Sequence, residues 1–302
     1  MDERQIIITP VLIDDVLKND KISINTNNCT IIPPTNYHEV LNAGNTQFWI
    51  NKFHGSSYRT LILDNEDIEW MKDALAIGAI TGNFSNLFSD SLRWTLEKNK
   101  EGEEWISKGE WFIRLEEISL KTGMYGTGPY NSLEKIIKSI VTSNRTYRCL
   151  ENKSMITIYF LPFIKGLDYM KEFRVFVFQG EITAISQQSL YSENSWLTYL
   201  YKKNMLEEFV REKILIPFKQ LIKPKMEDYL TNYVMDYALI ESEDENESVG
   251  FKSLRPYFIE PNSWGADYAA GSALFGWLQD YNKLYDNKDV EFRFVLSKKP
   301  KQ

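Results

Sequence analysis

Two strand-like segments near the C-terminal end of the chain carry acids where a buried strand normally has hydrocarbon side chains. In NYVMDYALI, Val234, Asp236 and Ala238 share one strand face, and in PYFIEPN, Glu260 and Asn262 share another, because side chains alternate along a strand. A buried carboxylate without a partner is costly, and a hard divalent cation offsets that cost. Magnesium takes one or two protein carboxylates and leaves its other positions to water and phosphate oxygens. The pattern therefore predicts a magnesium site that accompanies a nucleotide.

The segment EFRVFVFQGEITAIS, residues 172–186, predicts a β-hairpin. Two runs of β-branched and aromatic residues flank a turn expected at Gly180 and Glu181. Glu172 and Arg174 then share one face. The guanidinium of Arg174 can bind two phosphate oxygens, or it can pair with an acid on a neighbouring strand. We favour the phosphate interpretation.

A second cationic segment is EWFIRLEEISLKTG, residues 110–123. It places Arg114 inside a strand-like run and Lys121 where that run gives way to a loop with glycines at 123, 126 and 128. Cations beside backbone amides that glycine leaves accessible suit phosphate binding. The sequence therefore predicts that this loop helps to hold the phosphates.

The order of several segments resembles that of the cell-division-cycle protein 123 family. The resemblance covers roughly residues 48 to 277 and rests on FWINKFHGSSYRTLIL (48–63), FIRLEEISLKTG (112–123), SIVTSNR (139–145), YFLPFIKGLDYMKEFRVFVFQGEITAISQQ (159–188), YVMDYALI (233–240) and FIEPNSWGADYAAGSALFGW (258–277). The segment EFRVFVFQGEITAISQ is its most specific part. Members of this family have an ATP-grasp fold, and in eukaryotes they help to assemble translation initiation factor 2 by binding its gamma subunit.

The resemblance implies an α+β protein of the ATP-grasp type, in which two lobes with antiparallel sheets enclose ATP and Mg²⁺. It also implies that the hinge segment 158–163 lies against the adenine, and it implies which residues bind the cofactor and the metal. The expected cofactor-binding residues are Arg114, Lys121, Tyr159, Leu161, Glu172 and Arg174, and the expected metal ligands are Asp236, Glu260 and Asn262. Three positions depart from the family pattern: Arg114 stands where many relatives have lysine, Thr122 where aspartate is usual, and Tyr159 where an arginine is common.

The length of 302 residues exceeds one ordinary domain. We expect an N-terminal α/β region over residues 1–105 and an ATP-grasp core over 106–302, with a helical insertion near 190–231 that Pro217 breaks or kinks. Apolar spacing predicts further helices over 67–78, capped by Asn65 or Asp67, and over 132–140. Residues 1–47 are predicted as strands and loops, and the acidic run 241–247 as a solvated loop.

Composition excludes several classes of function. The net charge is −7, and the 35 basic residues are scattered, which argues against nucleic acid as the main partner. Cys29 and Cys149 are too few for a disulfide framework or a thiolate metal site, and His38 and His54 are too few for a histidine-rich zinc site. No P-loop or dinucleotide motif occurs, and no apolar run approaches the roughly 20 residues of a membrane span. We therefore expect a cytoplasmic protein.

The function expected first is binding: ATP and Mg²⁺ stabilise a state that holds a protein client, which by the resemblance is the gamma subunit of translation initiation factor 2. Two alternatives stay open. One is an ADP-forming ligase that joins a carboxylate to an amine or thiol through an acyl phosphate. The other is a scaffold with a vestigial ATP site, which the departures at Thr122 and Tyr159 favour. If the chain is an enzyme, we expect an ATP-dependent, ADP-forming ligase.

Overall fold

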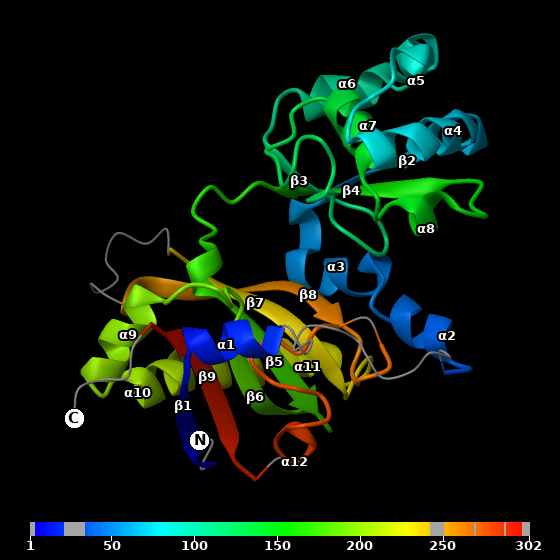
Figure 1. The fold of residues 1–302 in the computed structure, drawn as a ribbon. Coiled ribbons are helices and arrows are strands. Elements are labelled where there is room, and N and C mark those ends of the chain that lie inside the picture. Colours follow the sequence, from blue (N-terminus) through cyan, green and yellow to red (C-terminus); the bar gives the residue numbers. More distant parts are fainter. Residues whose placement is uncertain (1–3, 21–33, 242–250, 269, 287, 298–302) are drawn as a thin grey trace. The chain divides into compact units, whose positions relative to one another are not determined.

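The computed structural model of the chain describes residues 4–20, 34–241, 251–268, 270–286 and 288–297. The described chain combines helices and strands, as the predicted α+β class requires, and it forms two compact units (Figure 1). Unit 1 consists of Met1–Gly44 and Gly166–Gln302, and unit 2 consists of Asn45–Lys165. No helix in the described ranges has both the length and the apolar character that a membrane crossing requires.

Unit 1 contains a six-stranded sheet in the order β1-β9-β6-β5-β7-β8. The strands are β1 (Ile6–Leu12), β5 (Glu172–Phe178), β6 (Glu181–Gln187), β7 (Tyr233–Glu241), β8 (Leu254–Asn262) and β9 (Val290–Leu296). The predicted hairpin is β5 and β6, although its turn lies at Gln179 and Gly180, one residue earlier than expected. β9 pairs parallel with both β1 and β6, whereas the other pairs are antiparallel. The sheet is therefore mixed, because the long segment 263–289 lets β9 cross to the far side of β6.

The helical elements of unit 1 occupy its N-terminal segment and the predicted insertion. They are α1 (Ile13–Asp20), α2 (Tyr37–Asn42), η3 (Tyr169–Lys171), α9 (Ser195–Lys202), α10 (Leu206–Val210), the π-helical η4 (Arg211–Leu215) and η5 (Phe218–Ile222), α11 (Lys223–Met226), η6 (Phe251–Ser253) and α12 (Tyr281–Leu284). The prediction of only strands and loops in residues 1–47 is therefore wrong for α1 and α2. The acidic run lies outside the described residues except for Glu241, which ends β7.

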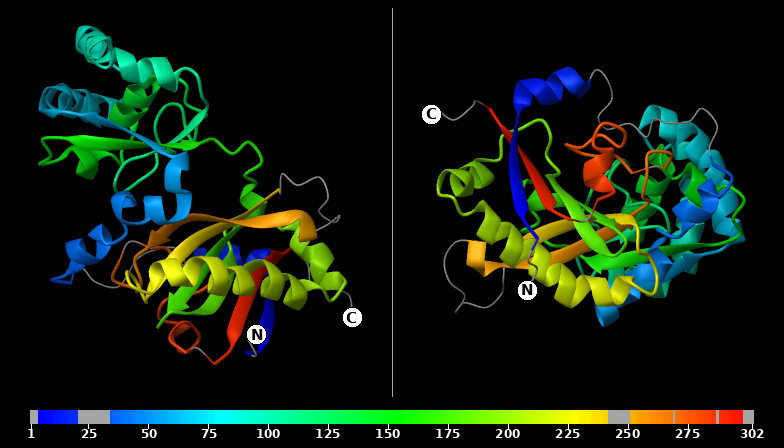
Figure 2. Two further views of the ribbon diagram at one scale, coloured as in Figure 1. Left: turned by 180° about the vertical axis from the view of Figure 1, so that it is seen from behind. Right: turned by 90° about the horizontal axis from the view of Figure 1, so that it is seen from below.

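The helical run from α10 to α11 lies along the sheet of unit 1 (Figure 2). Phe209 of this run is fully buried, with its ring centroid 5.9 Å from that of Phe173 on β5 and 6.4 Å from that of Phe292 on β9. Pro217 does not break the run, because it lies between two π-helical turns. A wider turn moves the carbonyls that a proline ring would otherwise meet, so the helix continues past it.

Unit 2 contains a three-stranded antiparallel sheet in the order β2-β4-β3. Its strands are β2 (Arg59–Leu63), β3 (Trp111–Arg114) and β4 (Ile156–Pro162), and its helices are α3 (Thr46–His54), η1 (Gly55–Ser57), α4 (Asn65–Thr81), η2 (Asn86–Phe88), α5 (Ser89–Lys98), α6 (Lys100–Ile106), α7 (Leu133–Thr142) and α8 (Tyr147–Leu150). The predicted helices over 67–78 and 132–140 are confirmed as α4 and α7. Asp64, rather than Asn65 or Asp67, caps α4, because its side chain accepts the backbone N–H groups of Glu66 and Asp67.

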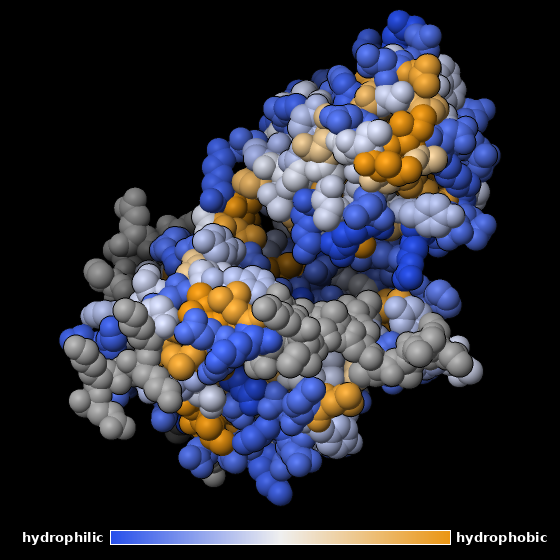
Figure 3. Space-filling model, viewed as in Figure 1, coloured by the Kyte–Doolittle hydropathy of each residue, from blue (hydrophilic) through white to orange (hydrophobic). Residues whose placement is uncertain are grey.

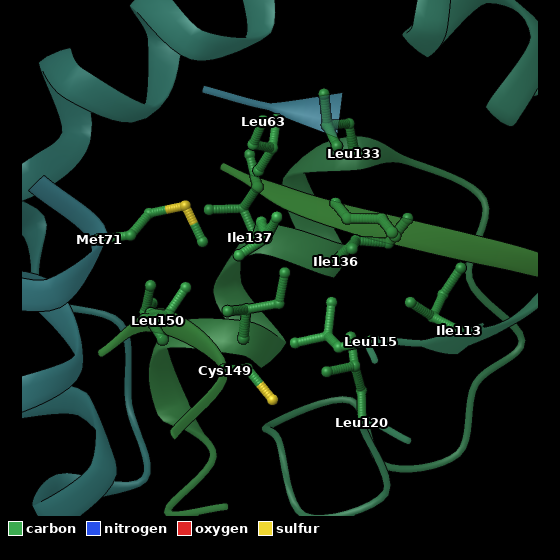
Figure 4. Packing of buried hydrophobic residues seen from close by; sticks show 14 of the residues in the cluster. Leu63, Met71, Ile113, Leu115, Leu120, Leu133, Ile136, Ile137, Cys149 and Leu150 are labelled. Atoms are coloured by element: carbon green, nitrogen blue, oxygen red, sulfur yellow. The ribbon is translucent and has the colours of Figure 1, made fainter. Parts of the chain in front are cut away.

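The core of unit 2 lies between its sheet and its helices (Figure 4). Leu63 on β2, Met71 on α4, and Ile136 and Ile137 on α7 are fully buried there. The free thiol of Cys149 belongs to the same cluster, and burial raises its pKa to about 12. Cys149 is thus a core residue that stays protonated at neutral pH.

The division into units differs from the predicted boundary between residues 105 and 106. The elements β2, α4 and α5 lie before that boundary and α6 spans it, yet all four belong to the same unit as β3 and β4. The reason is that β4, the central strand, pairs with β2 on one side and β3 on the other. The chain enters unit 2 at Asn45 and leaves it after Lys165, so unit 2 is inserted in unit 1.

Gly78 sets how closely α4 approaches α7, and its replacement tests the packing of unit 2. A Cβ atom on this residue would lie 2.1 Å from the backbone O of Val141, which cannot move as a side chain can. Although alanine favours a helix over glycine by about 1 kcal/mol, we expect Gly78→Ala to lower the free energy of unfolding by about 2 kcal/mol. Chemical denaturation followed by tryptophan fluorescence measures the change.

Gly102→Ala in α6 is the matched control. Its Cβ would lie 3.1 Å from Cδ1 of Leu61, the end of a flexible side chain. We expect a change within about 1 kcal/mol of the native value. Equal effects of the two substitutions would contradict the close packing of α4 on α7.

Candidate functional site

Three charged residues from the predicted site lie in one row across the sheet of unit 1. Arg174 on β5 is directly opposite Asp236 on β7, and Asp236 is directly opposite Glu260 on β8. Asn262 follows on β8, opposite Val234. Directly opposite residues of an antiparallel pair project to the same face. The register thus brings the predicted acids and one predicted arginine together, as the period of two in the sequence indicates.

Arg174 and Asp236 form a two-pronged ion pair. Nε of Arg174 donates to Oδ1 of Asp236 at 2.9 Å, and Nη2 donates to Oδ2 at 3.0 Å. Nη1 donates to the backbone O of Gly271 at 2.8 Å, and Nδ2 of Asn262 donates to Oδ2 of Asp236 at 3.4 Å. The side chains of the pair are only 14% and 13% exposed. This is the cross-strand pairing that the sequence left open as the alternative to phosphate binding.

The charge of Arg174 is secured by the acids of the row. Burial of the guanidinium favours its neutral form, but the adjacent carboxylates of Asp236 and Glu260 outweigh that effect, so the pKa of Arg174 is raised. Arg174 therefore stays a cation at neutral pH. It balances part of the negative charge that two acids on adjacent strands bring to one place.

The donor set fits magnesium. Two carboxylates, of Asp236 and Glu260, and the amide oxygen of Asn262 are hard oxygen ligands of the kind that Mg²⁺ takes together with water and phosphate. Both oxygens of Asp236 accept hydrogen bonds from Arg174, and a carboxylate oxygen has a further lone pair for a cation. No group of three or more His, Cys, Asp or Glu side chains that could hold a metal occurs in the described ranges. The assignment of these three residues to a metal stays a prediction.

Glu172 begins β5, two residues before Arg174, opposite Ala238 on β7. Its carbonyl accepts the backbone N–H of Gln188 at 3.0 Å. It lies on the same strand face as Arg174, as the sequence predicts, at the end of the row. Its role in nucleotide binding is not tested by this geometry.

Arg114 lies in unit 2, at the end of β3. It is 2% exposed, its guanidinium carbon lies 5.1 Å from the ring centroid of Trp49, and its Nε donates to Oγ1 of Thr46 at 3.4 Å. This residue is opposite Tyr159 on β4. A guanidinium over an aromatic face is stabilised electrostatically. Arg114 therefore already has a structural environment, and its contact with phosphate stays a prediction.

The predicted adenine hinge is the last part of β4. Tyr159 is buried, and its hydroxyl donates to the carboxylate of Glu116. The β2 ladder ends opposite Phe160, so Leu161 and Pro162 pair with β3 alone. One side of the backbone at Leu161 thus lies beyond the strand pairing of the described chain, where a strand-like partner such as an adenine edge can bind. The side chain of Tyr159 thus already has a structural environment, and its contact with nucleotide stays a prediction.

The glycine loop after Lys121 does not have the accessible amides that the sequence predicts. The N–H groups of Gly123, Gly126 and Gly128 donate to the backbone O atoms of Leu120, Gly123 and Tyr125, at 2.9, 2.9 and 3.4 Å. A Cβ on Gly123 would lie 2.4 Å from the backbone O of Ser139, so glycine is needed there for packing against α7. The amides of these three glycines are therefore bonded within the loop, and the phosphate-binding role of the loop stays a prediction. Lys121 itself is exposed.

The sequence did not predict the contact between Arg174 and the backbone of Gly271. The carbonyl of Gly271 fixes the third side of the Arg174 guanidinium, and any residue has such a group, so no sequence signal could identify it. The loop that carries it is held by Arg293 on β9. Nη1 of Arg293 donates to the backbone O of Leu274 at 3.1 Å, and Nη1 and Nη2 reach Asp280 at 2.8 and 2.7 Å. These contacts position the loop against the row.

Comparison with solved structures gives a fold. Cdc123 from Schizosaccharomyces pombe matches with a TM-score of 0.56 at 14% identity, over 89% of this chain and 100% of that chain. A C-terminally truncated Cdc123 from the same organism matches with a TM-score of 0.57 at 13% identity, over the same shares. The resemblance drawn from the sequence motifs is thus confirmed at the level of the fold. Neither a known family model nor a curated protein sequence matches the chain.

Replacement of Asp236 tests how strongly the row depends on the ion pair. Asp236→Asn keeps the shape of the side chain but leaves the buried Arg174 without its full counter-charge. We expect the free energy of unfolding to fall by about 3 kcal/mol. Chemical denaturation of the purified protein measures the loss.

Asp280→Asn is the control, because the Arg293–Asp280 pair in the same unit is similarly buried, with side chains 16% and 19% exposed. We expect a loss of similar size. A loss below about 1 kcal/mol for Asp236→Asn alone would contradict the picture of a buried, mutually dependent pair.

Proposed function

We propose, from the fold shared with Cdc123, that this protein binds ATP with Mg²⁺ at the row in unit 1 and assists the assembly of a protein client. The client proposed, by the sequence resemblance, is the gamma subunit of translation initiation factor 2. The observation that carries the proposal is the row itself. It gathers two acids, an amide and a permanently charged arginine on three adjacent strands of a sheet whose fold is that of Cdc123.

Each residue of the row has a defined part in this proposal. Asp236, Glu260 and Asn262 would hold Mg²⁺, and the ion would neutralise the phosphate charge. Arg174 is kept charged by the two acids, and its side chain is 14% exposed. We propose that its remaining N–H groups meet the phosphate. Its hydrogen bond to the carbonyl of Gly271 fixes its plane. A fixed guanidinium loses little freedom when it binds phosphate.

The surface of unit 2 offers apolar side chains for a contact with another protein. On the face of unit 2 seen in Figure 3, apolar side chains gather in places. Ile80, at the end of α4, is 87% exposed, and Leu87 in η2 is 83% exposed, the highest values among the large apolar side chains described. Contiguous exposed apolar patches mark interaction surfaces, whereas single exposed apolar residues are common. We propose that Ile80 and Leu87 contact the client as parts of one such patch.

A second candidate function is a scaffold that no longer binds nucleotide. The observation that favours it is that Arg174 and Asp236 satisfy one another through two hydrogen bonds. A pair of this kind is stable without any ligand. The two candidates differ in whether Asp236 accepts a metal in addition to Arg174.

Calorimetric titration with ATP separates the two candidates. For the native protein we expect binding that requires Mg²⁺ and disappears with a chelator, since the acids repel a triphosphate without the cation. Asp236→Asn should weaken binding at least about tenfold, which corresponds to about 1.4 kcal/mol. Gly78→Ala in unit 2, for which we expect a loss of about 2 kcal/mol, controls for a general loss of stability and should keep the native affinity. Equal affinities of the native protein and Asp236→Asn would refute the metal assignment.

A binding assay with purified initiation factor gamma subunit tests the client. We expect the native protein to retain the gamma subunit. The double variant Ile80→Glu, Leu87→Glu should lose it, because burying a charge in an apolar contact is costly. Leu278→Glu is the control, since Leu278 is 65% exposed but belongs to unit 1. Absence of retention by the native protein at micromolar concentration would argue against this client while leaving the nucleotide proposal intact.

A further inference from the structure

The strand β2, at the edge of the sheet in unit 2, lacks the features that protect the other sheet edges of the described chain. In unit 1 the edge strands β1 and β8 contain prolines, at Pro10, Pro256 and Pro261, and proline offers no N–H group to a further strand. In unit 2 the outer edge of β3 is covered, because Trp111 and Tyr130 exchange two backbone hydrogen bonds of 2.9 and 2.8 Å. β2 has no proline and pairs only with β4 in the described sheet. It is therefore an open template for another strand.

The hydrogen bonding of β3 shows which backbone groups of β2 face outward. Trp111 points its groups away from β4, as its bonds outside the sheet show. Because this direction alternates along a strand, Arg114 bonds to Tyr159, which lies opposite it on β4. Tyr159 therefore turns its groups away from Thr60, its opposite residue on β2. Thr60 and Ile62 thus direct their N–H and C=O groups to the open edge, where none has a partner in the described part of the chain.

The side chains of the same two residues suit a further strand. Ile62 is 56% exposed and Thr60 is exposed as well, whereas Leu63 on the opposite face is fully buried in the core of unit 2. Thr60 and Ile62 are β-branched, and residues of this type pack well against cross-strand neighbours. An added strand would remove apolar surface of Ile62 from water, which stabilises the pairing.

The charges at the two ends of β2 are opposite in sign. Arg59 begins the strand and has no acid partner in the described part of the chain. The strand is followed by three acids, which are Asp64, Glu66 and Asp67. Lys98 contacts them at 2.5, 3.9 and 3.1 Å, so three acids against one lysine leave a surplus of two negative charges. A partner strand fits best when its acids lie at the first end of β2 and its cation at the last.

We propose that β2 pairs antiparallel with β2 of a second copy of this chain. An antiparallel copy meets the charge requirement by itself, because the Arg59 end of each strand lies beside the acidic end of the other. With Leu61 on the two-fold axis, Thr60 of each copy lies opposite Ile62 of the other, and each such pair exchanges both of its hydrogen bonds. Every outward group of Thr60 and Ile62 is then bonded. The inference goes beyond the proposed function, since it involves neither nucleotide nor client.

Sedimentation equilibrium of the whole protein tests this inference. Pairing through one edge strand gives a small interface, so we expect a weak dimer with a Kd of about 20 µM. At a protein concentration of about 200 µM most chains are then dimeric. The measured mass should rise with concentration from the chain mass of 35.4 kDa toward twice that value. The experiment contains neither ATP nor a client, so its result does not depend on the proposed function.

Two substitutions at Ile62 oppose the pairing without removing a hydrogen bond of the fold. Ile62→Pro deletes an N–H group that points to the open edge, and Ile62→Lys places a charge where the second strand would lie. Each should weaken the dimer at least about tenfold. Leu278→Lys is the matched control, since Leu278 is 65% exposed but lies in unit 1, and it should keep the native Kd. Thermal unfolding of each variant checks that the fold is retained, and Ile62→Lys alone tests the pairing if the proline variant does not fold.

Reversal of one charge tests the antiparallel direction. Arg59→Glu brings an acid beside the acidic end of the other copy and should raise the Kd at least about threefold. The double variant Arg59→Glu, Glu66→Lys restores opposite charges between the copies and should recover part of this loss.

Three outcomes would overturn the inference. One is a mass that stays at that of a single chain up to about 200 µM. The second is a dimer whose Kd is the same in the native protein and in the Ile62 variants, which would place the interface elsewhere. The third is a Kd that Arg59→Glu leaves unchanged, which would contradict the antiparallel direction.

Discussion

The buried guanidinium of Arg174 is the group on which the arrangement of unit 1 depends. It binds the carboxylate of Asp236 on the neighbouring strand and the carbonyl of Gly271 in the loop beyond β8, so one side chain joins three segments that are far apart in the sequence. A slip of one residue between β5 and β7 would turn Asp236 to the opposite face and leave a buried charge unpaired. The pair therefore fixes the strand register as well as the candidate site.

The same pair links stability to ligand binding. Without a ligand, the carboxylates of Asp236 and Glu260 keep Arg174 charged, and the attraction between Arg174 and Asp236 offsets part of the cost of burying this pair. The two acids then carry one negative charge more than Arg174 balances. In the proposed function a magnesium ion would share these acids and balance the remaining charge, and phosphate would share the guanidinium.

Elements with a clear local period could be predicted from the sequence. The helices α4 and α7, the hairpin of β5 and β6, and the convergence of Arg174, Asp236 and Glu260 all follow from periods of 3.6 or 2. Features that depend on distant packing could not be predicted. The sequence pattern of the glycines after Lys121 indicated accessible amides. In the structure Gly123 instead leaves room for Ser139 of α7, which lies against it. The two units do not divide at the predicted boundary after residue 105. The reason is that β4, the central strand of the sheet in unit 2, is the last of its strands in the sequence and pairs with strands on both sides of that boundary.

The order of strands in unit 1 has a consequence for synthesis on the ribosome. β1 is made first, but in the described sheet it pairs only with β9, which is made last. Unit 2 is one continuous stretch of chain and has all its strands long before then. The inserted unit can therefore fold while the nascent chain is still growing, whereas β1 must wait for β9 to leave the exit tunnel. Premature termination before Val290 would release a chain in which β1 lacks the strand that it pairs with in the described sheet.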